Sequence, residues 1–414
     1  VGTVSDKTLT FGTPVVFKSD YVAKTAITFD SVNNKIVIAY RDDNSLAYGI
    51  AVVGTVSGTS ISFGSNVTFE SNAVSSLAAC FDENAGKVLL AYAQGNPGYA
   101  LVGTVSGTSI SFGTRAIFES GGGTQYTRAY YDASQQKSLI AFMDSGNADR
   151  GTARVATISG TTVSFGTAVI FASGSAFAIG LAGNNNGTVL LAYCDVANSD
   201  LVTAVAGTIS GTSVTFGTQQ TLGVDSERND QRRHRVAYDA GAETFFISFI
   251  ERVSDNNEYI TATVSGTTIT ASSAQEITSG YALANDVVYD AGQQTIVCSF
   301  SDSAALGTDG PGTSIAYQFA GTRPNLTSEN YIGMSGGPAS PSFFGTAAIF
   351  ETGAIDDIGS AYDSTNNCHV IAYQDEGNSN YGTAVVATVS GSTVSFGTPI
   401  VFETGITKYV SPVF

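Results

Sequence analysis

The chain is poor in the side chains that most often carry out catalysis or bind metals. In 414 residues it has no tryptophan, two methionines, four cysteines and only two histidines, His234 and His369. Because His369 lies inside an apolar segment, we expect neither a His-based catalytic triad nor a histidine metal cluster. The cysteines are far apart and fall at different positions of the repeats described below, which predicts isolated buried thiols: Cys80, Cys194, Cys298 and Cys368.

Charge is also scarce and unbalanced. Only 13% of residues are charged, with 18 basic against 35 acidic side chains and a formal net charge of -17. Such a field repels polyanions, so we expect neither nucleic acid nor anionic lipid as a partner.

No run of 18 apolar residues offers a membrane span. Val1 stands in the middle of a repeated phrase, and we expect the chain to be a processed piece of something longer.

The sequence is rich in one repeated phrase. Residues 51–69 read AVVGTVSGTSISFGSNVTF, and edited copies recur at 101–118, 154–171, 204–222 and 385–402. Val, Ile and Phe alternate in it with Gly, Thr and Ser, which is the period of two of a half-buried strand. Its Ser57-Gly58 predicts a two-residue hairpin turn, and its Phe63-Gly64 predicts a bulge or bend in the second strand.

A second recurring element is a short run that is apolar on both faces. It reads KIVIAY at 35–40 and returns as KVLLAY (87–92), KSLIAF (137–142), TVLLAY (188–193), TFFISF (244–249), TIVCSF (295–300) and CHVIAY (368–373). A strand that does not alternate is covered on both sides. Together with a half-buried strand before it and the two-strand phrase after it, this run predicts four short antiparallel strands per repeat.

The repeat spacing predicts one all-β domain over residues 1–414, a single β-propeller of four-stranded antiparallel blades. Repeats start near residues 2, 54, 103, 156, 207, 262, 321 and 387, a spacing typical of propeller blades. The recognisable strands exceed the number needed for seven blades and fall one short of eight. Because surplus strands would leave open edges, eight blades are favoured, with the ring closed by strands from both termini. Seven blades are the close alternative.

Irregular segments interrupt the repeats at 227–235, 302–312 and 323–342. Loops that break a repeat commonly carry binding surfaces. The candidate binding residues are Arg228, Arg232, Arg233, Arg235, Asn325 and Tyr331. The arginines, together with His234, would bind a carboxylated or sulfated glycan through bidentate hydrogen bonds to its anionic groups. The alternatives are a solvated loop and a contact to a neighbouring acidic subunit.

Acidic residues recur at two positions of the repeat. One set follows the doubly apolar strand and would gather at one mouth of the propeller: Asp42, Asp144, Asp195, Glu251, Asp302 and Asp375. There it would bind Ca²⁺ or sugar hydroxyls, or each acid would accept backbone N–H bonds within its own loop. The other set opens the loop before that strand and predicts Asx turns: Asp30, Asp82, Asp132, Asp239, Asp290 and Asp363.

No catalytic residue is indicated by these patterns. A propeller glycosidase needs two carboxylates that face one substrate, and a sialidase needs an arginine cluster as well. The chain has arginines but lacks the Ser-x-Asp-x-Gly-x-x-Trp loop repeats of sialidases. No metal site and no cofactor other than Ca²⁺ is suggested.

The repeat reads GTVSGTSISFGT, then Val/Ile-x-Phe-Glu, then Tyr-Asp-x-x-x-Asn-Lys-Val-x-Ile-Ala-Tyr. This repeat sequence resembles the repeats of structural and tail-fibre-like proteins of marine bacteriophages. The resemblance covers almost the whole chain and is weakest from 301 to 342. It implies a virion context and a propeller, and it transfers no functional residue.

These patterns predict a non-enzymatic β-propeller on a virion or other extracellular surface. It would attach to host-surface glycans or to a neighbouring structural protein of the same particle. Two alternatives stay open: a purely architectural decoration or collar subunit, and a propeller-fold glycoside hydrolase. Paired carboxylates in a deep central pocket would favour the hydrolase.

Overall fold

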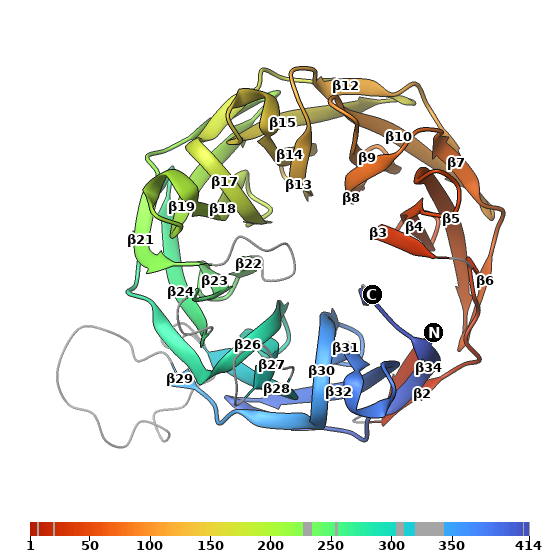
Figure 1. Cartoon of the computed structure of the whole chain (residues 1–414), viewed down its shortest axis with the longest axis vertical. Helices are drawn as coiled ribbons and strands as arrows, with labels where there is room; N and C mark the ends of the chain where they lie inside the picture. Colours follow the sequence, from red (N-terminus) through yellow and green to blue (C-terminus); the bar gives the residue numbers. More distant parts are fainter. Residues whose placement is uncertain are drawn as a thin grey trace.

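The computed structural model describes residues 1–5, 8–19, 21–226, 234–252, 256–303, 310–318, 343–408 and 410–413. These residues form antiparallel β-strands with three short 3-10 helices and no α-helix. The helices are η1 (Ser145–Asn147), η2 (Val196–Asn198) and η4 (Glu376–Asn378). Figure 1 shows small sheets arranged around a common centre, each with its first strand innermost.

The described strands repeat one pattern of three long strands seven times, and we number these units sheets 1 to 7 in chain order, although β17, β26 and β30 join sheets 3 and 4 and sheets 5 to 7 by continuous hydrogen bonding. The innermost strands are β3 (Val22–Asp30), β8 (Val74–Asp82), β13 (Thr124–Asp132), the end of β17 (Val169–Gly183), β22 (Arg235–Asp239), and the ends of β26 (Gln275–Asp290) and β30 (Ala348–Asp363). The second strands are β4 (Lys35–Asp42), β9 (Lys87–Gln94), β14 (Lys137–Asp144), β18 (Thr188–Asp195), β23 (Thr244–Ile250), β27 (Thr295–Ser303) and β31 (Cys368–Asp375). The third strands are β5 (Tyr48–Ser57), β10 (Gly98–Ser106), β15 (Arg150–Ser159), β19 (Leu201–Ser210), β24 (Asn256–Ser265), β28 (Gly310–Gln318) and β32 (Tyr381–Ser390).

The outer strand of each sheet is broken into two segments that pair with different halves of the third strand. The first segments are β6 (Ser60–Phe63), β11 (Ser109–Phe112), β16 (Thr162–Phe165), β20 (Ser213–Phe216), β25 (Thr268–Ala271), β29 (Phe343–Phe344) and β33 (Thr393–Phe396). The second segments are β7 (Val67–Glu70), β12 (Ala116–Glu119), β21 (Gln220–Asp225), β34 (Ile400–Ile406) and the starts of β17, β26 and β30. These last three strands therefore run from the outside of one sheet to the inside of the next.

The break falls at the Phe-Gly pair for a reason that lies in the neighbouring sheet. A Cβ on Gly64 would lie 1.7 Å from the carbonyl oxygen of Thr108, which is in the hairpin turn of the next sheet. The same contact recurs between Gly113 and Thr161, at 1.8 Å. Only glycine allows two backbones to approach this closely. The glycine that the sequence marks as a bulge is thus one of the points where consecutive sheets touch.

The two residues of the hairpin turn lie one position later than the Ser57-Gly58 pair that the sequence predicts. Ser57 pairs with Ser60, so the two turn residues are Gly58 and Thr59. Gly58 has a φ of 57° and Thr59 does not share the positive sign, which fits a type II′ turn with glycine in first place.

Burial of the second strands confirms the prediction made from their pattern. In β9, Val88, Leu89, Leu90 and Ala91 are all 0% exposed. Hydrophobic clusters form between consecutive sheets, and one of them joins Leu89 of sheet 2 to Phe142 of sheet 3. The four cysteines are buried thiols, as predicted.

Two N-terminal strands stand outside the seven sheets. β1 (Gly2–Ser5) and β2 (Thr8–Phe11) pair only with each other among the described strands. The ring of Phe11 packs 5.6 Å from that of Phe402 in sheet 7, and Phe17 packs 5.7 Å from Phe63 in sheet 1. Figure 1 shows this hairpin and the C-terminal end between sheets 7 and 1.

Candidate binding site in the central cavity

A polar cavity lies where the innermost strands converge. It has a volume of about 640 Å³ and is lined from opposite sides by residues 24–25, 75–77, 123–128, 356–360 and 410–412, with Gly95, Arg235 and Asp286. Hydroxyl, amide and charged side chains dominate this lining. Because the lining strands belong to sheets on opposite sides, the cavity occupies the centre of the molecule (Figure 1).

A bulge in the innermost strands shapes the cavity wall. Pairing with the second strand shifts register between Ala23 and Ala26 in sheet 1, and equivalent shifts recur in sheets 2, 3, 4, 6 and 7. Non-glycine residues take a left-handed conformation at this bulge: Lys24, Ser76, Tyr126, Ala178 and Asp357, with φ between 44° and 52°. Each such residue costs about 1 kcal/mol or more of backbone strain. Strained positions that recur around one cavity are typical of a binding site.

Hydrogen bonds between neighbouring sheets fix much of this wall. Ser76 Oγ donates to Thr127 Oγ1 at 2.8 Å and accepts from the Thr127 amide at 3.0 Å. On the other side, Asp286 Oδ2 accepts from the amide and the hydroxyl of Ser360 at 2.7 and 2.9 Å. The wall is therefore preorganised before any ligand enters.

Arg235 is the one arginine of the predicted basic cluster that the structure describes. Its Nε donates to the carbonyl oxygen of Asn285 at 2.9 Å and lies 3.2 Å from Asp286. It faces the cavity but already has an acidic partner in the next sheet. Arg228, Arg232, Arg233, Asn325 and Tyr331 lie outside the described residues, as do most of the two insertions at 302–312 and 323–342.

His234 is a structural residue and not part of a basic surface. It is 1% exposed, with Nδ1 3.0 Å from the carbonyl oxygen of Ala178 and Nε2 3.2 Å from Ser226 Oγ. A carbonyl only accepts, so Nδ1 carries a proton. Burial lowers the pKa of His234 to about 4, so the ring is neutral at pH 7.

The six predicted ring acids are not among the residues that line the cavity. Asp144 accepts from the Gly146 amide at 3.1 Å and begins η1, while Asp195 and Asp375 precede η2 and η4. Asp42 accepts from the Asn44 amide at 3.1 Å and pairs with Lys18 at 3.1 Å. Glu251 forms a β-bridge to Ser226, and Asp302 lies in β27 opposite Ala282. The contacts of Asp42 and Asp144 match the turn-capping alternative, whereas the side chains of Asp195 and Asp375 form no capping hydrogen bond to η2 and η4.

No group of three or more His, Cys, Asp or Glu within the described part of the chain is arranged to hold a metal ion. Burial alone would raise the pKa of Asp42, but hydrogen bonds led by Lys18 lower it. Burial, followed by the charge of Glu119, raises the pKa of Asp144. Burial, followed by the charge of Glu351, likewise raises the pKa of Asp375. The acids sit in separate local environments, one per sheet.

Sequence reasoning missed the second acid in these environments. It is the Glu that follows the Phe of the outer segment, at Glu70, Glu119 and Glu351. Glu70 accepts from Tyr92 Oη at 3.2 Å and Glu351 accepts from Tyr373 Oη at 3.2 Å. The recurrence of Phe-Glu was the signal that could have revealed it.

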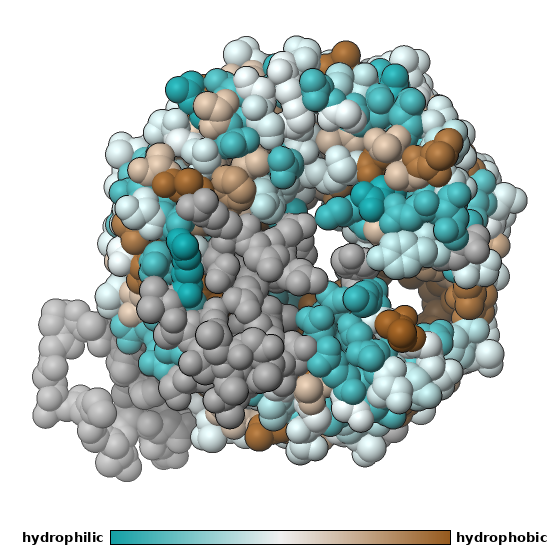
Figure 2. All heavy atoms as spheres, in the orientation of Figure 1, coloured by the Kyte–Doolittle hydropathy of each residue, from teal (hydrophilic) through white to brown (hydrophobic). Residues whose placement is uncertain are grey.

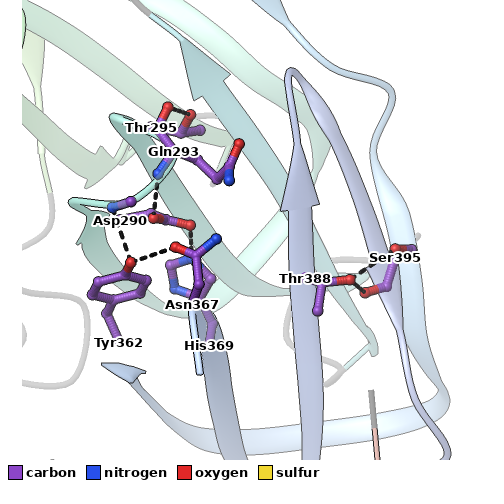
Figure 3. Close-up of polar contacts among 9 residues, drawn as sticks. Asp290, Gln293, Thr295, Tyr362, Asn367, His369, Thr388 and Ser395 are labelled. Carbon is purple, nitrogen blue, oxygen red and sulfur yellow. Dashed lines mark hydrogen bonds and ion pairs between the residues drawn. The ribbon is translucent and has the colours of Figure 1, made fainter. Parts of the chain in front are cut away.

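The predicted Asx turns form at the opposite end of the second strands. Asp290 accepts from the Gln293 amide at 2.7 Å, and its other oxygen lies 3.0 Å from Nε2 of His369 in sheet 7 (Figure 3). Tyr362, also in sheet 7, donates to Asn367 Oδ1 and accepts from the Gly292 amide. Burial alone would raise the pKa of Asp290, but hydrogen bonds led by that from His369 lower it. The turn therefore also fastens sheet 6 to sheet 7.

No protein-family model and no curated protein matches this chain. Among solved structures, Sqt1 of Chaetomium thermophilum bound to the N-terminus of the ribosomal protein L10 is 12% identical. That match covers 93% of this chain and 97% of the other, with a TM-score of 0.52. It shows the fold alone, that of a β-propeller.

Two weaker similarities reach a TM-score of 0.45. One is to a protein from Lactobacillus plantarum, 11% identical over 73% of this chain and 83% of the other. The other is to the K499G mutant of NanB sialidase from Streptococcus pneumoniae, 8% identical over 69% and 65%. Both are too distant to inform fold or activity.

Within the described part of the chain, none of the helices has the length and apolar character needed to cross a membrane.

Proposed function

We propose that the chain is one domain, a single eight-bladed β-propeller whose last blade is built from both ends of the chain. In sheets 1, 2, 3 and 6, a Phe of the outer segment packs on a Phe of the next sheet, as Phe69 does on Phe112 at 5.8 Å. Phe402 stands in the same relation to Phe11, and Phe17 to Phe63. Counting the N-terminal hairpin as a blade between sheets 7 and 1 continues this pattern.

The C-terminal segment supports the same count. A Cβ on Gly180 of sheet 4 would lie 2.4 Å from the carbonyl oxygen of His234, which immediately precedes the innermost strand of sheet 5. A Cβ on Gly359 of sheet 7 would likewise lie 2.7 Å from the carbonyl oxygen of Val410. Residues 410–412 thus take the innermost position of an eighth blade, and they line the central cavity with the other innermost strands.

We infer that this propeller is a non-enzymatic attachment module on a virion or other extracellular surface, and that its central cavity binds a host-surface glycan. The preorganised polar lining of the cavity carries this inference. Hydroxyl and amide groups such as those of Thr25, Ser75 and Gln125 match the alternating donors and acceptors of sugar hydroxyls. Tyr126 adds a ring on which a sugar face could stack. The virion setting rests on the resemblance of the repeat wording.

Glycan-array binding followed by titration calorimetry tests this function. Lys24→Ala combined with Gln125→Ala removes two side chains from the cavity wall and should weaken binding about thirtyfold, since each of the two lost hydrogen bonds is worth about 1 kcal/mol. Lys87→Ala, on a second strand away from the cavity, is the matched control and should bind like the parent. Equal binding by all variants would exclude the cavity as the site. Turnover of a bound oligosaccharide would instead identify a hydrolase.

A further inference from the structure

Arg235 is held at its backbone by sheet 4 and at its side chain by sheet 6. The residue before it, His234, is buried, and its amide and its Nδ1 lie 3.2 and 3.0 Å from the carbonyl oxygen of Ala178. The guanidinium Nε donates to the carbonyl oxygen of Asn285 at 2.9 Å and lies 3.2 Å from Oδ1 of Asp286. Only 18% of the arginine side chain is exposed. Contacts on both sides therefore fix the position of this side chain.

Asp286 is in turn held by the sheet beyond it. Its Oδ2 accepts from the amide and the hydroxyl of Ser360 at 2.7 and 2.9 Å, while its Oδ1 is the oxygen nearest to Arg235. A series of contacts thus runs from sheet 7 through sheet 6 to the arginine of sheet 5. An arginine fixed in this way loses little conformational freedom when it binds a ligand.

The terminal amines of this guanidinium, Nη1 and Nη2, take no part in these contacts. Within the described residues neither of them forms a hydrogen bond, and neither is fully buried. Arg235 lines the central cavity, so these two donors face it. Figure 2 shows an opening at the centre of this face, bordered by teal, hydrophilic residues. Two parallel N–H donors at a fixed spacing match the two oxygens of a carboxylate.

Two acidic residues line the same cavity from sheet 7. Asp356 and Asp357 are consecutive residues of β30, and both are half-buried. Carboxylates accept hydrogen bonds from hydroxyl groups but repel another carboxylate. A ligand that suits the arginine and these two acids together carries a carboxylate on one side and hydroxyl groups on another. The cavity volume of about 640 Å³ is in the range of small-molecule pockets.

We propose that the central cavity binds a hexuronate residue of a glycan, with its carboxylate on Nη1 and Nη2 of Arg235 and its hydroxyl groups donating to Asp356 and Asp357. This inference rests on the proposed function of the cavity and names the sugar that it takes. Asp286 and Ser360 are positioning residues, because they act through the arginine. A neutral hexose offers the arginine no anion, and a sulfate group presents its oxygens in a tetrahedral and not a planar arrangement.

Titration calorimetry on the intact chain tests this preference with methyl glucuronoside and methyl glucoside. The two sugars differ only in a carboxylate in place of a hydroxymethyl group. The glucuronoside should bind at least about tenfold more tightly, because its hydrogen bonds to the arginine are charge-assisted. In Arg235→Gln the two affinities should lie within about threefold of each other, with that of the glucoside close to the parent value.

A matched control is available in Arg150, which also donates from Nε to a carbonyl oxygen, that of Ser173 at 3.2 Å, and does not line the cavity. Arg150→Gln removes the same charge and should keep the tenfold preference for the glucuronoside. Asp286→Asn should reduce this preference and leave glucoside binding unchanged, since it disturbs only the orientation of Arg235. A change in the ratio of the two affinities separates these roles from a loss of folding, which removes binding of both sugars.

Should Arg235→Gln not fold, Arg235→Lys keeps the charge without the paired donors and should also lower the preference. Equal affinity of the parent for both sugars, or a preference that survives in Arg235→Gln, would overturn the inference. Tighter binding of glucose 6-sulfate than of the glucuronoside would exclude a carboxylate as the preferred anion. Failure to bind either methyl glycoside while other glycans bind would overturn this inference alone. Failure to bind any glycan would overturn the proposed function as well.

Discussion

His234 should make the stability of this protein fall as the pH is lowered from neutrality. The side chain is fully buried and neutral, held between the carbonyl of Ala178 and the hydroxyl of Ser226. Its folded pKa is about 4 against an ordinary value of 6.5. The contribution to stability is therefore fully present above pH 6.5 and is lost as the pH falls toward 4, because only the unfolded chain takes up the proton.

The size of the effect follows from the two pKa values. Each unit of difference corresponds to about 1.4 kcal/mol, so the full loss is about 3 kcal/mol, and about 2 kcal/mol is already lost at pH 5. His234→Gln keeps a donor and an acceptor but does not titrate. Between pH 7.5 and pH 5, the difference in unfolding free energy between parent and variant should therefore shrink by about 2 kcal/mol.

Urea unfolding at a series of pH values measures this difference. The chain has no tryptophan, so far-ultraviolet circular dichroism or the fluorescence of its 19 tyrosines reports unfolding. Carboxyl groups that titrate near pH 4 are common to both proteins and cancel in the comparison. A parent–variant difference that stays constant from pH 7.5 to 5 would refute the buried, neutral state of this histidine.

Two further substitutions test contacts between sheets. Asp290→Asn should cost about 1–3 kcal/mol, because its amide group would face either the ring N–H of His369 or a backbone N–H. Asp239→Asn, in the equivalent turn without a histidine, should cost less. The pH-dependent part of the penalty of Asp290→Asn should be fully present above pH 3.8 and should be lost as the pH falls through the lowered pKa of Asp290. Gly64→Ala should cost about 3 kcal/mol in urea unfolding, because the new methyl group meets the next hairpin turn. Gly58→Ala has open space and should cost about 1 kcal/mol from its φ of 57° alone; equal costs would contradict the contact between sheets.

The candidate site was only partly readable from the sequence. The Asx turns could be predicted because Asp30 and its equivalents accept from amides two or three residues ahead, as Asp30 does from Val32 and Asn33. The cavity could not, because its lining comes from sheets hundreds of residues apart, and the strained bulge at Lys24 or Tyr126 has no recurring residue type. The pairing of Arg235 with Asp286 likewise depends on how sheet 5 meets sheet 6.

The sequence by itself determined what is local and periodic: the repeat, the glycine turns, the strands buried on both faces and the isolated thiols. These follow from alternation and turn chemistry within a few residues. The tertiary structure decided what depends on one sheet meeting another. It broke the outer strand at Gly64 against Thr108 and left Ile36 and Ile38 less covered than their equivalents. The similar sequences of the repeats do not encode such differences, since they arise from what lies beside each repeat in space.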